Sequence, residues 1–549
     1  MKNLKLLNDK IIYQIFPRSF KDSNNDGDGD IQGIISKLDY LKNLGIDAIW
    51  LCPVYDTNFV DAGYDVLDYK SIWKQFGTLD DFKKLVDEAR KRNIDIIMDI
   101  VLNHVSNEHE WFKKACESRD NKEHNYFIWR DELSEQEKEA MSIFGGSAWE
   151  YVPSVNRYYF HLFAKEQVDL NWEHPDTLKA MASVIDFWYQ IGVRGFRLDA
   201  IKHISKNFEE TKNNPAFAWC KGAVDYLKKF NEIAFKGKED AYTFGESSGI
   251  SASELIKYGS GNDKVADNYY NFAWWWIGWG KTTGRNGYDA NWDYKNFVYM
   301  QKPFQENENI KPYMFTNFLS NHDTSRSISR WGSENFFWKE SAKTHALFLM
   351  TLKGVPCVYY GEEIGLLNNN FNEREDFKDV DIYNAFSNLV DKEKVYSESE
   401  LLKYCNINSR DSGRAIMQWD NSVNYGFNKG KQTWIKTNDN GTSINVASQE
   451  NDDKSILSFY KEIIKLRKFD LKSVLVEGNS KINILESGLI QLEREFNEEK
   501  IIVLINMTDK EITNEIPNKY KQIISTYDDQ KQVKNIFRPY ESILLRKED

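Results

Sequence analysis

The sequence predicts an α/β protein: a (β/α)₈ TIM barrel with an inserted subdomain after strand 3 and a C-terminal antiparallel β domain. Three observations support this fold. Short apolar runs alternate with longer helical patterns to about residue 365, and several runs end in polar clusters. After about residue 472 the pattern changes to short alternating segments. Regular alternation of strands and helices is typical of a parallel sheet, and about eight such units close into a barrel.

The expected barrel strands are short apolar runs. Seven of them are clear: Ile11–Phe16, Ile46–Pro53, Ile94–Ile100, Gly195–Leu198, Tyr242–Gly245, Met314–Leu319 and Val355–Tyr360. An eighth run at Asn268–Phe272 is less distinct. Helical periodicity is plain at Leu79–Lys91 and Thr177–Gln190. These elements predict a catalytic barrel formed by residues 1–104 and 174–471.

Two regions depart from the alternation. Residues 105–173 follow the third strand, are polar and aromatic, and contain Gly145-Gly146-Ser147, which predicts a subdomain B inserted in a βα loop. Residues 472–549 contain alternating runs at Gly488–Leu492, Lys500–Ile505 and Ser542–Leu545. Such runs predict a small C-terminal β-sandwich domain.

Composition excludes several classes of partner. The 549-residue chain carries a formal net charge of −12, which disfavours nucleic acid and anionic membranes as partners. Its five cysteines have no CxxC spacing, and neither a signal peptide nor a run of ~20 apolar residues is present. We therefore expect a cytoplasmic protein, either a monomer or a homodimer, that acts on a small neutral substrate such as an oligosaccharide.

Acidic residues at the ends of the expected strands are the candidates for chemistry. Arg197 and Asp199 lie two apart on one strand, so their side chains share a face and the Arg would keep the carboxylate ionised. Glu246 follows an apolar strand and Gly245, where a raised pKa would suit a general acid. A structural ion pair and a solvent-facing glutamate are the alternatives at this point. No spacing indicates a zinc site or a phosphate-binding loop.

Four segments in order resemble the signature regions of the α-amylase superfamily, glycoside hydrolase family thirteen. They are Asp99–Ser106, Gly192–Ala200, Tyr242–Ser247 and Leu319–Arg326. The resemblance implies that Asp199 is a nucleophile, Glu246 an acid/base and Asp323 a third catalytic acid. It also implies that Arg197, His104 and His322 hold glucose in the first subsite.

Further segments resemble the oligo-1,6-glucosidase and α-glucosidase subfamily. Asp61-Ala62-Gly63-Tyr64-Asp65 is similar to its sugar-gripping loop, in which Asp61 and Tyr64 would bind the terminal glucose. Phe160–Trp172, which includes Phe163, resembles the end of its inserted domain. Ser409-Arg410-Asp411 followed by Arg414 resembles its late substrate loop, with Arg414 as the implied partner of Asp61. An acid–Arg pair that clamps the non-reducing end implies exo-action.

Departures from the subfamily pattern concern specificity. The residue after the proposed nucleophile is Ala200, where the resemblance would lead to Val or Thr. Lys202 and His203 follow and resemble the aglycone-subsite pair of true α-amylases. Thr324-Ser325 replaces the Gln-Pro common in oligo-1,6-glucosidases. The α-1,6 and α-1,4 linkages therefore both remain open.

One acidic segment near the N-terminus predicts a metal site. Its oxygen-bearing side chains alternate along the chain: Asp22, Asn24, Asp26, Asp28 and Asp30. The segment is not an EF-hand, because position twelve would be Gly33 rather than Glu. Related α-glucosidases carry a similar cation-binding loop, so the resemblance implies a structural Ca²⁺ or Mg²⁺ and no catalytic cofactor. A metal-free acidic turn is the alternative.

The combined expectation is a retaining, exo-acting α-glucosidase that releases α-glucose from isomalto- or malto-oligosaccharides through a covalent glycosyl-enzyme. Two alternatives are carried with it. One is a trehalose-6-phosphate hydrolase, which would need cationic groups for the phosphate. The other is a non-catalytic relative that serves as a binding or chaperone subunit.

Overall fold

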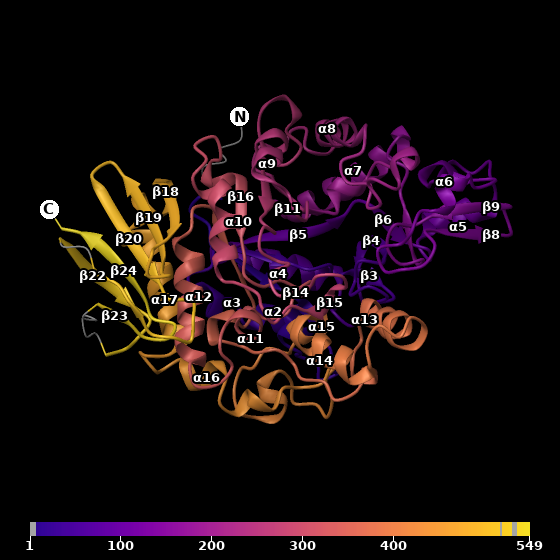
Figure 1. The fold of residues 1–549 in the computed structure, drawn as a ribbon. Coiled ribbons are helices and arrows are strands. Elements are labelled where there is room, and N and C mark those ends of the chain that lie inside the picture. The colour runs from indigo at the N-terminus through magenta and orange to yellow at the C-terminus, as the bar shows by residue number, and fades with distance from the viewer. Residues whose placement is uncertain (1–6, 517–518, 530–534, 549) are drawn as a thin grey trace.

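The computed structural model describes residues 7–516, 519–529 and 535–548 and contains a closed eight-stranded parallel barrel (Figure 1). The strands run around the barrel in the order β1-β17-β16-β13-β12-β11-β5-β2. Their bounds are β1 Ile12–Ile15, β2 Ala48–Leu51, β5 Asp95–Val101, β11 Gly195–Asp199, β12 Tyr242–Gly245, β13 Asn268–Tyr270, β16 Phe315–Asn317 and β17 Val355–Tyr359. Each lies within or overlaps an expected run, so the predicted TIM barrel is confirmed.

The apolar runs form strands because both of their faces are buried. Trp50, Ile97, Phe244 and Tyr270 point into the barrel and pack together there. Residues of the opposite face pack against the surrounding helices, which is why the strands appear in the sequence as nearly continuous apolar runs. The barrel is therefore a packed core, and a site can form only at one of its ends.

The two clearest predicted helices are also present. Helix α4 (Leu79–Lys91) begins with a capping box between Thr78 and Asp81. Helix α7 (Pro175–Ile191) has Pro at its first position and ends at Gly192, whose φ of 114° is readily adopted by glycine. These signals fix where each helix begins and ends, and both elements match the expected ranges.

The inserted subdomain leaves the barrel after β5 and projects from the side opposite the C-terminal sheet (Figure 1). Its base is the pairing of β6 (His104–Ser106) with β10 (Gln167–Asp169). Its outer part contains α5 (Glu110–Glu117), the 3₁₀ turn η2 (Lys122–Tyr126) and a three-stranded sheet in the order β7-β9-β8. These strands are Trp129–Arg130, Arg157–Phe160 and Trp149–Val152.

A second excursion lies between β17 and the last barrel helix, α17 (Ile456–Lys465). The predicted barrel domain includes this segment, but the segment forms its own apolar cluster around Phe377, Phe386 and Leu401. It contains α13 (Val380–Ala385), α14 (Glu398–Asn408) and the single turn α15 (Arg410–Gly413). This excursion carries α15 to the mouth of the barrel.

The C-terminal domain contains an antiparallel sheet in the order β18-β19-β20-β24-β22, which confirms the antiparallel β domain, while its description as a β-sandwich stays a prediction. The strands are Asn479–Ile484, Ile490–Phe496, Glu499–Ile505, Ser542–Lys547 and Tyr520–Ser525. It packs beside the barrel, where Lys302 Nζ donates to Asn483 Oδ1 at 2.6 Å. Within the described ranges, no helix combines the length and apolarity that crossing a bilayer requires. The five cysteines are unpaired thiols.

Candidate active site

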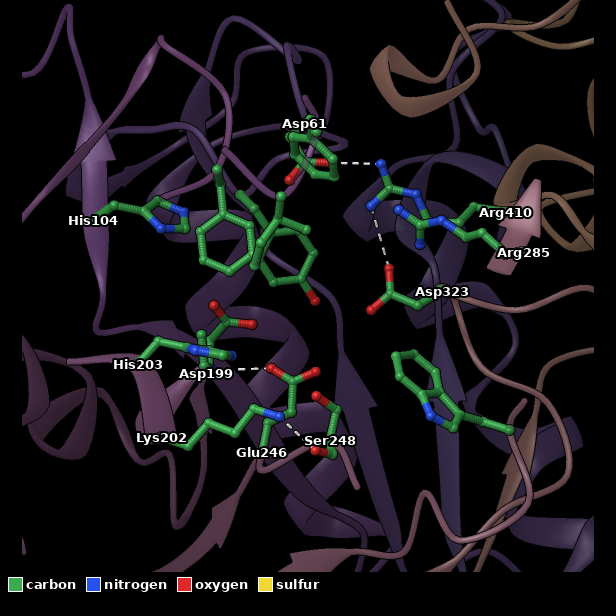
Figure 2. A pocket seen from close by; sticks show the side chains of 16 residues that line it. Asp61, His104, Asp199, Lys202, His203, Glu246, Ser248, Arg285, Asp323 and Arg410 are labelled. Carbon is green, nitrogen blue, oxygen red and sulfur yellow. Dashed lines mark hydrogen bonds and ion pairs between the residues drawn. The ribbon is translucent and has the colours of Figure 1, made fainter. Parts of the chain in front are cut away.

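A pocket of about 780 Å³ opens at the carboxyl ends of the barrel strands. Its walls come from the barrel, the inserted subdomain and the excursion after β17, and Figure 2 shows that acidic and basic side chains face one another across it. The lining residues are Asp61, Tyr64, His104, Ile143, Phe144, Phe163, Asp199, Ala200, Lys202, His203, Glu246, Ser248, Trp275, Arg285, Asp323 and Arg410. The size is suited to a small organic ligand. The structure thus brings together most of the residues predicted from sequence.

Arg197 organises three carboxylates at the base of this pocket. It contacts Asp199, pairs with Asp99 through Nη1 at 2.7 Å, and pairs with Glu246 through Nη2 at 3.0 Å. Arg197 and Asp199 are two residues apart on β11, so their side chains share a face, as predicted. Asp99 lies beside Arg197 on the neighbouring strand β5. A single buried guanidinium therefore fixes the positions of Asp199 and Glu246 relative to each other.

Asp199 and Glu246 both pair with Arg197, so their carboxyls lie close together. Burial raises the pKa of Asp199 and Arg197 opposes this, while the adjacent carboxyls of Glu246 and Asp99 raise it further. Neighbouring carboxyls oppose each other's ionisation, and the Arg197 guanidinium between them offsets part of this repulsion. The arrangement places two carboxyl groups side by side at the base of the pocket.

Ala200 connects these two acids through an unusual backbone conformation. Its φ of 49° and ψ of 32° are left-handed, which is uncommon for a residue other than glycine. In this conformation its N–H donates to Glu246 Oε2 at 2.9 Å. The backbone strain thus accompanies a contact that orients Glu246.

An ion pair between Asp61 and Arg410 forms the opposite wall (Figure 2). Asp61 lies between β3 (Tyr55–Thr57) and β4 (Val66–Ile72), in a tight turn where Gly63 has a φ of 99°. Arg410 Nη2 is 2.9 Å from Asp61 Oδ1, and the exposed fractions of the two side chains are 6% and 7%. The pair is therefore almost entirely shielded from water.

The prediction that Arg414 pairs with Asp61 was wrong. Arg410 begins the turn of α15 and reaches the pocket, whereas Arg414 lies one turn further along at its end. Arg414 instead donates from Nε to the carbonyl of His322 at 2.9 Å and pairs with Asp379 at 3.4 Å. Both arginines occur in the segment identified from sequence, but only the direction of the turn distinguishes them.

Asp323 faces Asp199 and Glu246 across the pocket (Figure 2). Burial alone would raise its pKa, but His322, Arg410 and Arg414 outweigh burial and hold the pKa well below its ordinary value. Arg410 Nη1 lies 3.4 Å from Asp323 Oδ1. Asp323 is therefore an ionised carboxylate at neutral pH.

Gln167 joins the Asp61 wall to His104. Its Nε2 donates to Asp61 Oδ2 at 3.1 Å and to His104 Nε2 at 3.0 Å. Burial lowers the pKa of His104 to about 4, so the ring is neutral. Phe163 packs beside it with ring centroids 5.2 Å apart. His104 and Phe163 line the pocket as expected.

Arg197 and His322 lie directly behind residues that line the pocket, and their contact with the sugar stays a prediction. Gln14 Nε2 donates to His322 Nδ1 at 2.8 Å, and His322 Nε2 therefore donates to the Tyr64 hydroxyl at 2.6 Å. Tyr64 in turn donates to Asp99 Oδ2 at 2.9 Å. His322 stacks behind Tyr64 at 5.3 Å, so it positions a residue that does line the pocket.

The remaining wall contains the predicted specificity residues Lys202 and His203. Lys202 Nζ donates to the carbonyl of Ser248 at 2.5 Å. Arg285 and Trp275, which sequence reasoning missed, complete this wall. Arg285 is held by Asp381 at 2.7 Å. The dense tryptophans between positions 274 and 279 were the available signal for an aromatic wall.

The predicted metal loop has only part of the expected arrangement. Its donors are carboxylate and amide oxygens, which suit a hard cation by their chemistry. Asp22, however, accepts three backbone N–H bonds of the loop and one from Asn428, while Asp28 pairs with Arg18 and Asp30 caps α2 (Ile31–Ser36). Across the described part of the chain, no group of three or more His, Cys, Asp or Glu side chains is placed to hold a metal.

Known proteins are similar to this chain over nearly its whole length. Residues 14–478 match the family model for the α-amylase catalytic domain. The chain is 36% identical to an oligo-1,6-glucosidase of Parageobacillus thermoglucosidasius, with 97% of each protein covered. It is 33% identical to a trehalose-6-phosphate hydrolase of Bacillus subtilis, with 98% of this chain and 97% of that protein covered.

Solved structures also match the fold of the chain over nearly its whole length. An isomaltulose synthase of Protaminobacter rubrum superposes with a TM-score of 0.91 at 32% identity, and the match covers 99% of each chain. The chain belongs to the α-amylase family of glycoside hydrolases.

Proposed function

We propose that the protein is a retaining, exo-acting α-glucosidase that cleaves short α-glucosides. The observation that carries this proposal is the pairing of both Asp199 and Glu246 with Arg197, in a pocket whose far wall is the Asp61–Arg410 pair. Retaining glycosidases hold their two carboxyls about 5–5.5 Å apart, whereas inverting enzymes leave room for a water between them. Two carboxyls that pair with one guanidinium lie close together, which fits the retaining arrangement.

Two neighbouring carboxyl groups suit the first step, because one can attack while the other donates a proton. Asp199 attacks the anomeric carbon from the β face, opposite the departing α oxygen, as Glu246 protonates that oxygen. The glycosidic C–O bond breaks and a glucosyl ester forms on Asp199. Water then attacks the same carbon, Glu246 accepts its proton, and the ester bond breaks to give α-glucose and the starting carboxylate.

The Asp61–Arg410 ion pair supports action on the terminal glucose of a chain. A carboxylate and a guanidinium in contact can together bind two neighbouring hydroxyls of a terminal glucose, since one accepts and the other donates. Asp323 extends this set and, as an ionised carboxylate, would stabilise the positive charge that develops on the sugar. Arg410 contacts both carboxylates, so it connects recognition of the sugar end with the charge at the reacting carbon.

A second candidate is hydrolysis of trehalose-6-phosphate. It is favoured by the presence of two cationic side chains, Lys202 and Arg285, on the pocket wall, and by the similarity to the Bacillus subtilis enzyme. Arg285 is neutralised by Asp381, whereas Lys202 contacts a carbonyl. One uncompensated cation on this wall gives weaker support for a phosphorylated aglycone than for a neutral one.

A substrate panel separates these candidates. We expect isomaltose or maltose to be hydrolysed with a higher kcat/KM than trehalose-6-phosphate or sucrose, and the first product detected by NMR to be α-glucose. Preference for trehalose-6-phosphate would select the second candidate. Initial release of β-glucose would contradict the retaining mechanism in either case.

We also propose that residues 22–30 bind a structural Ca²⁺ or Mg²⁺, with Asp22, Asn24 and Asp26 as the side chains that would turn toward it. Burial raises the pKa of the Asp28 and Asp30 carboxyls even though both accept hydrogen bonds, and a nearby cation would relieve this cost. A chelator should lower the Tm of the wild type and leave that of the Asp22→Ala, Asp26→Ala variant unchanged. Equal responses of the two proteins would contradict cation binding at this loop.

A further inference from the structure

A second hollow, of about 770 Å³, lies where the inserted subdomain meets the barrel, and we call it the rear pocket. One side is formed by η2 and β7 of the subdomain. The other side comes from Ile204–Phe208, the Asn171–Glu173 link and Tyr226 of α8 (Ala223–Ala234). None of the groups assigned to catalysis above lines it.

The lining combines aromatic surfaces with planar polar groups. Trp129, Phe208 and Tyr226 contribute ring surface, and Asn125 and Arg157 contribute amide and guanidinium groups. Aromatic rings pack against the C–H faces of sugars, and planar amide and guanidinium groups bind vicinal hydroxyls. This combination is what a saccharide requires of a binding site.

Arg157 supplies an unused donor at this place. Its Nη1 donates to His124 Nε2 at 3.2 Å and its Nη2 to Asp131 at 3.1 Å. Its Nε is buried and lacks a hydrogen-bond partner among the residues that the structure describes. An unpartnered buried donor costs free energy, so Arg157 has hydrogen-bonding capacity that its protein partners do not use.

The charges around the rear pocket nearly balance, which indicates a neutral ligand. Lys206 pairs with Asp169 at 2.8 Å, Arg130 with Glu137, and Arg157 with Asp131. Glu173 adds a negative charge at the rim. An anion such as phosphate would therefore meet guanidinium groups that already have carboxylate partners.

The rear pocket is also connected to the catalytic pocket. The short segment that carries Lys202 and His203 into the catalytic pocket continues directly into Ile204–Lys206, which lines the rear pocket. Lys206 Nζ additionally donates to Asn103 Oδ1 at 3.0 Å, next to His104. We propose that the rear pocket is a second binding site for a neutral saccharide, separated from the aglycone wall by this segment.

Fluorine NMR of protein labelled with 5-fluorotryptophan tests the proposal, because each pocket contains a tryptophan. Trp275 reports on the catalytic pocket and Trp129 on the rear pocket, and their signals are assigned by Trp→Phe substitution. Isomaltose is titrated into the non-hydrolysing Asp199→Asn variant. We expect both signals to shift, with different half-saturation concentrations.

Two variants of the lining separate direct binding from relayed effects. Tyr226→Ala removes a ring and Asn125→Trp fills the pocket from an exposed position; each should abolish the Trp129 shift and keep the Trp275 shift. Tyr299→Ala, at a tyrosine that is 61% exposed on α10 (Lys295–Gln305), is the matched control and should change neither. Conversely, Arg410→Ala should suppress the Trp275 shift alone.

Three results would overturn the proposal. The first is a Trp129 signal that does not move while the Trp275 signal saturates. The second is a Trp129 signal that moves as far in both lining variants as in the Asp199→Asn parent. The third is a Trp129 signal that responds to inorganic phosphate and not to isomaltose. Failure of Trp275 to respond would instead count against the proposed α-glucosidase function, because that residue lies in the catalytic pocket.

Discussion

The pairing of Asp61 with Arg410 can be tested by a double-mutant cycle. At the observed 2.9 Å, two unit charges attract by about 6 kcal/mol at an effective dielectric constant of about 20. Arg410 also contacts Asp379 and Asp323, and these carboxylates reduce the share that belongs to Asp61. Desolvation lowers it further, so we expect a coupling energy of about 2–4 kcal/mol.

The assay is kcat/KM for an aryl α-glucoside in the wild type, Asp61→Ala, Arg410→Ala and the double variant. Each single change should reduce kcat/KM by roughly 30-fold or more, since 1.4 kcal/mol corresponds to a factor of ten. The double variant should be little worse than the poorer single variant, because each residue depends on the other to bind the same hydroxyls. Thermal melts of all four proteins control for loss of folding.

Arg414 provides the matched control. It lies four residues from Arg410 and is also buried, but it pairs with Asp379, Asp411 and Asp323 and donates to the carbonyl of His322, without contacting Asp61. In the cycle of Asp61→Ala with Arg414→Ala the effects should add to within about 0.5 kcal/mol. Strong coupling of Asp61 to Arg414, with additive effects for Arg410, would refute the assignment of the pair.

Three further predictions concern single residues. Glu246→Gln should spare aryl glucosides with good leaving groups more than isomaltose, because such groups need little protonation, and equal losses of kcat/KM would count against an acid role. Ala200→Val should raise the isomaltose-to-maltose ratio of kcat/KM by roughly 10-fold or more while lowering Tm, because Val enters the pocket and is strained at a φ of 49°; an unchanged ratio would remove Ala200 from the specificity argument. Burial lowers the pKa of His345 to about 4, so this group's stabilising contribution is present above pH ~6.5 and is lost as the pH falls through about 4. The Tm deficit of His345→Gln relative to the wild type should therefore shrink between pH 7.5 and 5, and a constant deficit would contradict a buried neutral ring.

The barrel was predictable because its signals are local. Each strand is an apolar run whose period and bounding residues are visible in the sequence, and Thr78 and Gly192 mark helix ends. The eighth strand, β13, was less distinct because only Asn268–Tyr270 pair, between neighbours supplied by distant parts of the chain. Closure of the barrel, not local propensity, makes this segment a strand.

The site was predictable in its motif residues and not in the contacts between segments. Asp199, Glu246 and Asp323 come from strand ends and meet as expected. The partner of Asp61 depends on how a turn from the excursion after β17 enters the pocket, a long-range arrangement that spacing does not encode. The depth of His322 behind Tyr64 likewise depends on packing.

The central claim, that Asp199 becomes covalently glucosylated, can be measured directly. The enzyme would be incubated with 5-fluoro-α-glucosyl fluoride, whose ring fluorine slows hydrolysis of the ester, then digested and analysed by mass spectrometry. The account predicts one fluoroglucosyl group on the peptide that contains Asp199 and none in Asp199→Asn. A label on the peptide containing Glu246 or Asp323, or turnover of isomaltose with no label on Asp199, would contradict it.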